Sequence, residues 1–364
     1  MSFERGTFAV TIFELPDKLP DDYIERFAAR KAGTLDSVTD ELQVGWVSGR
    51  HLLENNITEE TISAGIGCRV TLRKAVRKIP ASLLNAMCSR EELIWMRANE
   101  SDFVPSRVKK ELKEEILEKN LQKFPPAVSG IPAVIDMATD TLYICTGSTA
   151  QLDEFLMEFN ETLHLDPVPF APAGMTEELA GCSVGDIPSL ELVKGALDEP
   201  NVNRDFLTAL WYFNETGRTA KHPEFGEFEI AVDGPLVFAN DEDGCNGAAE
   251  ISVKNGENPL RSAEAKAALS VGKKLRKAKI SLVRGDEVWS CVFDADKFNF
   301  SGMKLPEGEK LDQDSVFGER LLSCYIFKSG IAAFFRLYAE MMLGVNREKE
   351  VAAIQRWAAE HDGV

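Results

Sequence analysis

GIGCRVTLRKAVRKIP, the stretch at residues 65–80, holds the two patterns that decide the fold. Its first part, Gly65 to Val76, is rich in β-branched and apolar residues and predicts a strand. Pro80 then stands at a favourable first-turn position of a helix. A second, strongly charged helix follows over residues 108–123, so the segment 79–123 predicts a projecting helical hairpin.

Strands and helices are grouped, rather than alternating, on either side of this hairpin. Strands are predicted at residues 7–13, 45–47, 133–136, 141–145, 225–232, 248–253, 279–283 and 287–293. Helices are predicted at residues 21–32, 149–163, 206–213, 262–278, 315–343 and 347–359. This mixture predicts an α+β fold with mixed or antiparallel sheets and a helical C-terminus. The expected units are an N-terminal α+β domain (1–78 and 124–170), the hairpin (79–123), and a C-terminal α+β domain (186–364), with a proline- and glycine-rich break at 167–186.

The charge is unevenly distributed along the 364-residue chain, which has a net charge of −18. Phosphate binding needs cations, so this acidity opposes a nucleic-acid function. Two windows are basic, unlike the rest of the chain. Residues 69–90 hold six basic residues and no acid, and residues 261–284 hold eight basic residues and one acid. Together they carry +13 and leave −31 for the remainder. Such segregation predicts one electropositive surface on an acidic body.

Cysteine usage and apolar patterning point to the cytoplasm. The seven cysteines are scattered without a CxxC pair, and there are only four histidines, which favours reduced thiols and argues against a zinc site. The N-terminus lacks the pattern of a signal peptide. The apolar stretch at residues 331–344 is interrupted by Arg336 and Glu340, so we expect no membrane span and a soluble protein.

The first basic window lies on the predicted strand that leads into the hairpin. With a period of two, Arg69, Arg73 and Arg77 share one face, and Lys74 and Lys78 take the other. Guanidinium groups match phosphate oxygens, so the three arginines predict a phosphate-binding platform. The alternative is that they pair with acidic residues on a neighbouring strand.

The second basic window is predicted to be helical from Ser262 to Ala278. At 100° per residue, Lys266, Lys273 and Lys277 fall within about 40° of one another, with Lys274 nearby. This lysine stripe would span about 16 Å and meet successive phosphates along a DNA groove. The alternative is that the lysines only solvate an exposed helix face.

Catalytic patterns are weak in this sequence. No Walker lysine follows a glycine cluster, and no histidine lies in a recognisable triad motif. Glu264-Ala265-Lys266, with Asp233 upstream, loosely resembles a nuclease pattern, although Glu264 would stand at a helix start. We therefore expect no catalytic residue, no metal and no cofactor, with a metal-dependent DNA nuclease as the alternative.

Several short motifs occur in an order and spacing that resemble one family over nearly the whole chain. The N-terminal motifs are Gly45-Trp46-Val47, Arg77-Lys78-Ile79-Pro80, the charged helix that follows, Val134-Ile135-Asp136 and a helix led by Ser148. The C-terminal motifs are Phe206-Leu207-Thr208-Ala209-Leu210-Trp211, the predicted helix from Ala263 to Lys277, and Asp312-Gln313 through Phe317, Glu319 and Arg320. Together they resemble the RdgC recombination-associated family.

This resemblance implies a non-enzymatic protein that binds double-stranded DNA with little sequence preference. It also implies a closed homodimeric ring whose basic lining faces the DNA, located in the cytoplasm on the nucleoid, without membrane contact. Similar proteins restrain strand exchange by RecA-type recombinases, here through the shared DNA. The chain departs from relatives at Leu121 to Pro126, and it is longer around Glu224 to Pro259 and in its last helix.

Overall fold

The structure is a computed structural model that describes residues 3, 5–180, 182–193, 201–239, 248–254, 259–308 and 313–360. The N-terminal half contains, in chain order, β1 (Phe8–Glu14), α1 (Tyr23–Ala29), η1 (Leu35–Ser37), β2 (Gln43–Ser48), α2 (Glu59–Ile62), β3 (Ser63–Ala64), β4 (Gly67–Val76), α3 (Ala81–Ala98), α4 (Ser106–Asn120), η2 (Leu121–Lys123), β5 (Ala127–Asp136), β6 (Thr141–Ile144), α5 (Thr149–Leu163) and β7 (Val168–Pro169).

The C-terminal half begins with α6 (Pro172–Ala180) and η3 (Val184–Asp186), inside the segment for which the sequence predicted only a break. It continues with α7 (Val202–Thr216), β8 (Ala220–His222), β9 (Gly226–Ala239), β10 (Glu250–Val253), η4 (Pro259–Arg261), α8 (Ala263–Ser270), β11 (Lys274–Arg284), β12 (Glu287–Asp294), β13 (Asn299–Lys304), α9 (Gln313–Leu343) and α10 (Arg347–Ala359). The predicted helical C-terminus is confirmed, whereas the sequence analysis missed β13.

One large antiparallel sheet runs through both halves in the order β10-β9-β11-β12-β13-β1-β6-β5-β4-β2. The central strand β1 pairs with β6 of the N-terminal half and with β13 of the C-terminal half. The large antiparallel sheet and the helices grouped apart from it confirm the predicted α+β class. Strand β1 thus joins strands of both halves into one sheet. The division into two separate α+β domains stays a prediction.

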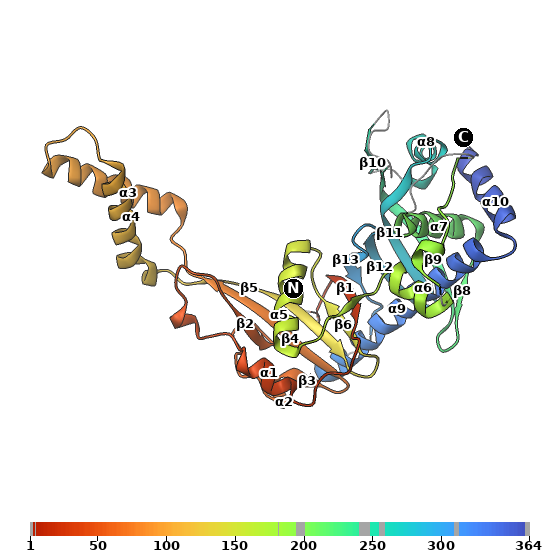
Figure 1. Cartoon of the computed structure of the whole chain (residues 1–364), viewed down its shortest axis with the longest axis horizontal. Helices are drawn as coiled ribbons and strands as arrows, with labels where there is room; N and C mark the ends of the chain where they lie inside the picture. The colour runs from red at the N-terminus through yellow and green to blue at the C-terminus, as the bar shows by residue number, and fades with distance from the viewer. Residues whose placement is uncertain are drawn as a thin grey trace.

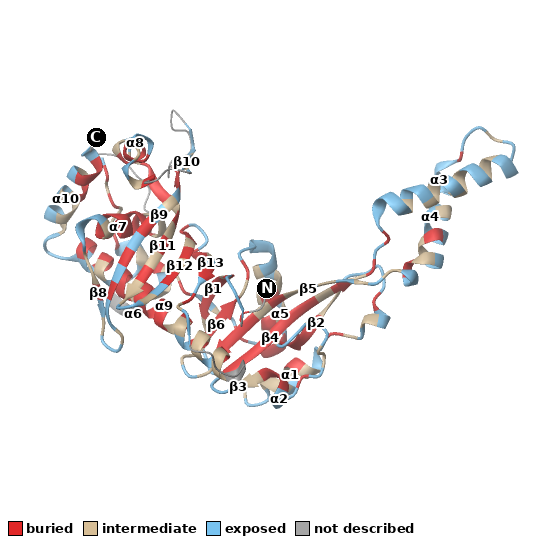
Figure 2. Cartoon of the chain, turned by 180° about the vertical axis from the view of Figure 1, so that it is seen from behind, coloured by how far each residue is buried: buried red, intermediate tan, exposed pale blue. Residues whose placement is uncertain are grey.

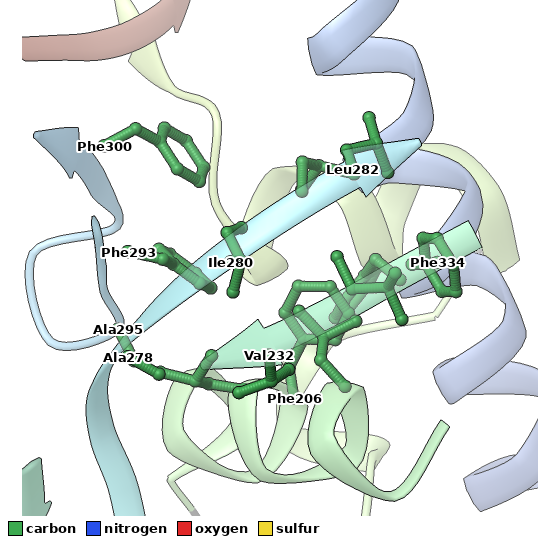
Figure 3. Packing of buried hydrophobic residues seen from close by; sticks show 14 of the residues in the cluster. Phe206, Val232, Ala278, Ile280, Leu282, Phe293, Ala295, Phe300 and Phe334 are labelled. Carbon is green, nitrogen blue, oxygen red and sulfur yellow. The ribbon is translucent and has the colours of Figure 1, made fainter. Parts of the chain in front are cut away.

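Helices cover opposite faces of the sheet in the two halves (Figure 1). Side chains alternate between faces along a strand. On β1, Phe13 belongs to the core beneath α1 and α5, while its neighbour Ile12 belongs to the core beneath α7 and α9. Figure 3 shows the second core, where Phe206 of α7, Ile280 of β11 and Phe334 of α9 meet. Helix α9 also reaches the other face of the N-terminal strands, because Val134 of β5 and Tyr143 of β6 belong to the same core as α9.

Helices α3 and α4 extend away from the sheet beyond the ends of β4 and β5 (Figures 1 and 2). They contact each other through pairs such as Lys109 and Glu92, whose charged atoms are 3.1 Å apart. No residue of α3 is buried, and Ile116 is the buried residue of α4. Isolated helices of this length are marginally stable in water, so this pair has few contacts of its own to hold it.

The length and composition of helix α9 do not agree with the expectation that no stretch of the chain could span a membrane. Its segment Ser315–Leu343 is long and apolar enough to cross a membrane by length and composition. Yet 61% of its most apolar window is buried, and Phe327, Phe334 and Tyr338 belong to the core against the sheet. This packing is that of a core helix.

The six described cysteines are free thiols, and Cys245 lies outside the described residues.

Candidate nucleic-acid interface

The three arginines of the first basic window share one face of β4, but that face is buried. Arg69, Arg73 and Arg77 are 3%, 2% and 6% exposed. The guanidinium carbon of Arg69 lies 5.4 Å from the centre of the Phe317 ring on α9. Arg73 donates hydrogen bonds to the backbone carbonyls of Leu52 and Gly33, and burial lowers the pKa of its guanidinium. As folded, this face is not a phosphate-binding platform.

Arg77 forms hydrogen bonds that connect the base of the α3–α4 pair with the segment before β2. Its Nε donates to the carbonyl of Val38 at 3.0 Å, and its two terminal nitrogens donate to the carbonyls of Leu35 at 3.0 Å and Phe124 at 2.6 Å. The segment around Leu35 precedes β2, and Phe124 follows α4. The predicted alternative, pairing with carboxylates on a neighbouring strand, is wrong for Arg77, because backbone carbonyls are the acceptors.

The two lysines on the opposite face of this strand differ from each other. Lys74 points toward α5 and forms an ion pair with Glu154. Lys78 is exposed at the base of the α3–α4 pair, and within the described part of the chain it has no ion-pair partner. Among the five cations predicted in the first window, Lys78 is therefore the exposed one without an ion-pair partner in the described part of the chain.

The predicted helix over residues 262–278 is wrong in its second half. Helix α8 ends at Ser270, and residues 274–284 form β11. Gly272 adopts a φ of +85°, and the N–H of Lys273 donates to the carbonyl of Ala268 at 3.0 Å. A glycine in the left-handed region is a common helix terminator, because it has no Cβ to clash. The predicted lysine stripe therefore does not exist.

Lys266 on α8 lies between two tryptophan rings. Its Nζ is 5.3 Å from the centre of the Trp211 ring, 5.1 Å from that of Trp357, and 3.3 Å from Oε2 of Glu215. Both indole N–H groups also donate to Glu215, Trp211 to Oε1 at 2.7 Å and Trp357 to Oε2 at 2.5 Å. We call Lys266, Glu215, Trp211 and Trp357 the ammonium cage. It joins α7, α8 and α10.

The other three lysines of this window also have partners inside the protein. Lys273 is buried and donates to the carbonyl of Ala248. Lys274 is fully buried in an ion pair with Asp205 of α7, at 2.6 Å. The side chain of Lys277 is 33% exposed, and its Nζ lies 2.8 Å from Oδ2 of Asp294 on β12. A phosphate would have to displace these partners.

A different pair of cations gathers at the base of α3 and α4. Lys78 lies two residues after the end of β4, and Lys123 lies one residue before Phe124, to which the neighbouring Arg77 binds. Lys123 is exposed, and its Nζ has the neutral acceptor Asn120 at 2.8 Å. We call Lys78 and Lys123 the neck lysines. The sequence did not reveal that the hydrogen bond from Arg77 to Phe124 brings these two lysines to the same end of the α3–α4 pair.

The residues of the loose nuclease pattern do not converge. Asp233 is exposed on β9 and lies 3.8 Å from Lys279, Glu264 is exposed in the first turn of α8, and Lys266 is in the ammonium cage. Among the described residues, no group of three or more His, Cys, Asp or Glu side chains could hold a metal ion.

Comparison with protein families places the N-terminal half. Residues 9–181, about half of the chain, match the family model described as "Putative exonuclease, RdgC". The matched region runs from β1 through α5 to α6 and includes the α3–α4 pair. No curated protein matches the chain. On the match over residues 9–181, the chain belongs to the RdgC family.

Proposed function

We propose that this chain is a cytoplasmic, nucleoid-associated protein that binds double-stranded DNA with little sequence preference, as a homodimeric ring around the duplex. The observation that carries this proposal is the match to the RdgC family, which implies a recombination-associated function. Through the DNA it covers, such a ring would restrain strand exchange by a RecA-type recombinase.

The shape of the chain supports a ring. The α3–α4 pair at one end and the region of β10 and α8 at the other end turn toward the same side, so the chain forms an arc (Figures 1 and 2). A second copy related by a two-fold axis, facing the first, would close the arc into a ring.

Each end of the arc offers a surface that a second copy can cover. At one end, Leu93, Ile94 and Phe103 are 52%, 51% and 70% exposed on or beside α3. Large apolar side chains that a chain leaves exposed at one end are candidates for an interaction surface. At the other end, β10 pairs only with β9 among the described strands, so one of its edges is open for pairing.

The neck lysines are our candidates for DNA contact. They are exposed and lie at the base of α3 and α4, whereas most of the sequence-predicted cations are bound inside the protein. Ammonium groups in such positions contact phosphates without reading bases, which fits binding with little sequence preference.

The dimer is tested by changing one end of the arc. Ile94→Glu places a charge among the exposed apolar residues and should convert a dimer into a monomer in sedimentation velocity. Leu53→Glu is the matched control, because Leu53 is 62% exposed in the loop after β2. A wild-type chain that sediments as a monomer with and without duplex DNA would contradict the ring.

A metal-dependent nuclease is the second candidate, and the family description "Putative exonuclease, RdgC" favours it. Incubating the full chain with linear duplex DNA and Mg²⁺ separates the two functions. DNA of unchanged length that migrates more slowly as a complex supports the binding function. Shortened DNA, above that in a sample with EDTA, would instead support the nuclease.

A further inference from the structure

A cavity of about 240 Å³ lies between α9 and the turn that joins β8 to β9. Glu14 of β1 and Phe170, directly after β7, complete its wall. In Figures 1 and 2, β8 and α9 lie on the convex side of the arc. A ring closed as proposed would hold DNA on the other, concave side of the arc.

Three cationic side chains line this cavity, opposed by one carboxylate. Lys221 on β8 and Arg336 on α9 are exposed, and neither forms an ion pair within the described ranges. The Nζ of Lys328 lies 2.7 Å from Oε1 of Glu14 and donates to Oγ1 of Thr141 at 3.1 Å. Like charges that converge in this way repel one another unless an anion lies between them. The wall thus has an excess of positive charge on a chain with a net charge of −18.

His222 also lines this wall, and its ring is held in place by backbone hydrogen bonds. Its Nδ1 accepts hydrogen bonds from the backbone N–H groups of Glu224 at 3.2 Å and Phe225 at 3.4 Å. The ring also stacks on Phe225, with centroids 5.1 Å apart. Because Nδ1 is an acceptor, a neutral imidazole carries its proton on Nε2, where it can donate.

The remaining wall combines hydroxyl groups with apolar surface. Tyr325 and Ser329 of α9 line the cavity, together with the apolar residues Phe170, Ala332 and Ala333. A small site with a few converging donors and a partly apolar wall is typical of a small-ligand pocket. Its volume suits a single phosphate group with a short substituent, rather than a nucleic-acid strand.

We propose that this cavity binds a phosphate dianion, either free or as the phosphomonoester of a small molecule. Arg336 and Lys221 would contact its oxygens from two sides, with Lys328 and His222 as further donors. Guanidinium and ammonium groups form strong, charge-assisted hydrogen bonds with phosphate oxygens. This proposal does not depend on the proposed DNA binding, because the two surfaces share no residue.

Isothermal titration of the full chain with inorganic phosphate, at constant ionic strength in chloride buffer, tests the proposal. We expect saturable binding of one phosphate per chain. The double variant Lys221→Gln/Arg336→Gln should weaken this affinity by at least about tenfold, because two charge-assisted contacts are lost. Both side chains are exposed, so the melting temperature without phosphate should stay close to that of the wild type.

The matched control is Lys18→Gln/Lys297→Gln, which removes the same charge from two exposed lysines without ion pairs among the described residues. It should bind phosphate as the wild type does. Absence of saturable binding to the wild type, or an equal loss in the control, would overturn the proposal. A fall in duplex DNA affinity for the Lys221→Gln/Arg336→Gln variant would also overturn it, since the cavity would then be a DNA contact.

Discussion

Lys266 provides a sharp test of the structure, because the sequence pattern made it a DNA contact and the fold makes it a structural group. The substitution Lys266→Met keeps the apolar stem and removes the ammonium from the ammonium cage. Two cation–π contacts at about 1 kcal/mol each would be lost, together with the ion pair to Glu215. Glu215 is 27% exposed and keeps two indole donors, so solvent screens part of the loss. We expect a destabilisation of about 2 kcal/mol.

Urea unfolding followed by tryptophan fluorescence measures this effect, because Trp211 and Trp357 are part of the cage. The midpoint should fall while the denaturant dependence stays constant. DNA affinity of the folded protein should not change. A double-mutant cycle with Glu215→Gln should give a coupling energy of about 1 kcal/mol. The control Lys297→Gln should change stability by less than about 0.5 kcal/mol. Wild-type stability of Lys266→Met, with a large loss of DNA affinity, would refute this reasoning.

Three further outcomes are expected. Arg77→Gln should lower the free energy of unfolding by about 3 kcal/mol in urea titrations, because several backbone carbonyls lose a charged donor; an unchanged midpoint would contradict this. Replacing both neck lysines, Lys78→Gln/Lys123→Gln, should make the slope of log affinity for duplex DNA against log salt shallower by up to about two, and an identical slope would exclude them as phosphate contacts. Burial raises the pKa of the Cys68 thiol to about 12, so Cys68 should resist a thiol reagent at pH 8 until urea unfolds the chain, as mass spectrometry of labelled peptides would show.

Local patterns were sufficient to predict most elements. The helix predicted over residues 149–163 has those bounds as α5, and the predicted strand at residues 287–293 is β12, which ends one residue later. The failure at residues 262–278 had a visible signal, because Gly272 is a typical helix-ending residue. An apolar and basic pattern continued past this glycine, so periodicity alone extended the helix into β11.

The candidate site was predicted less well, because residue type does not reveal which partner the fold supplies. The sequence predicts that Arg73 and Arg77 contact phosphates, yet loops distant in sequence bring backbone carbonyls to them. Lys274 has a buried partner, Asp205, that lies 69 positions away. Such contacts form through tertiary packing and leave no local pattern. The phosphate cavity was missed for the same reason, since its walls come from four separate segments.

Topological trapping on DNA tests the central claim most directly. The full chain is loaded at low salt onto a closed circular plasmid and onto the same plasmid cut once, and both complexes are then moved to high salt. Electrostatic contacts weaken in salt, but a closed ring cannot leave a circle without opening. We predict that the protein stays on the circular plasmid and slides off the linear one. Equal release from both forms would contradict a ring that encircles DNA.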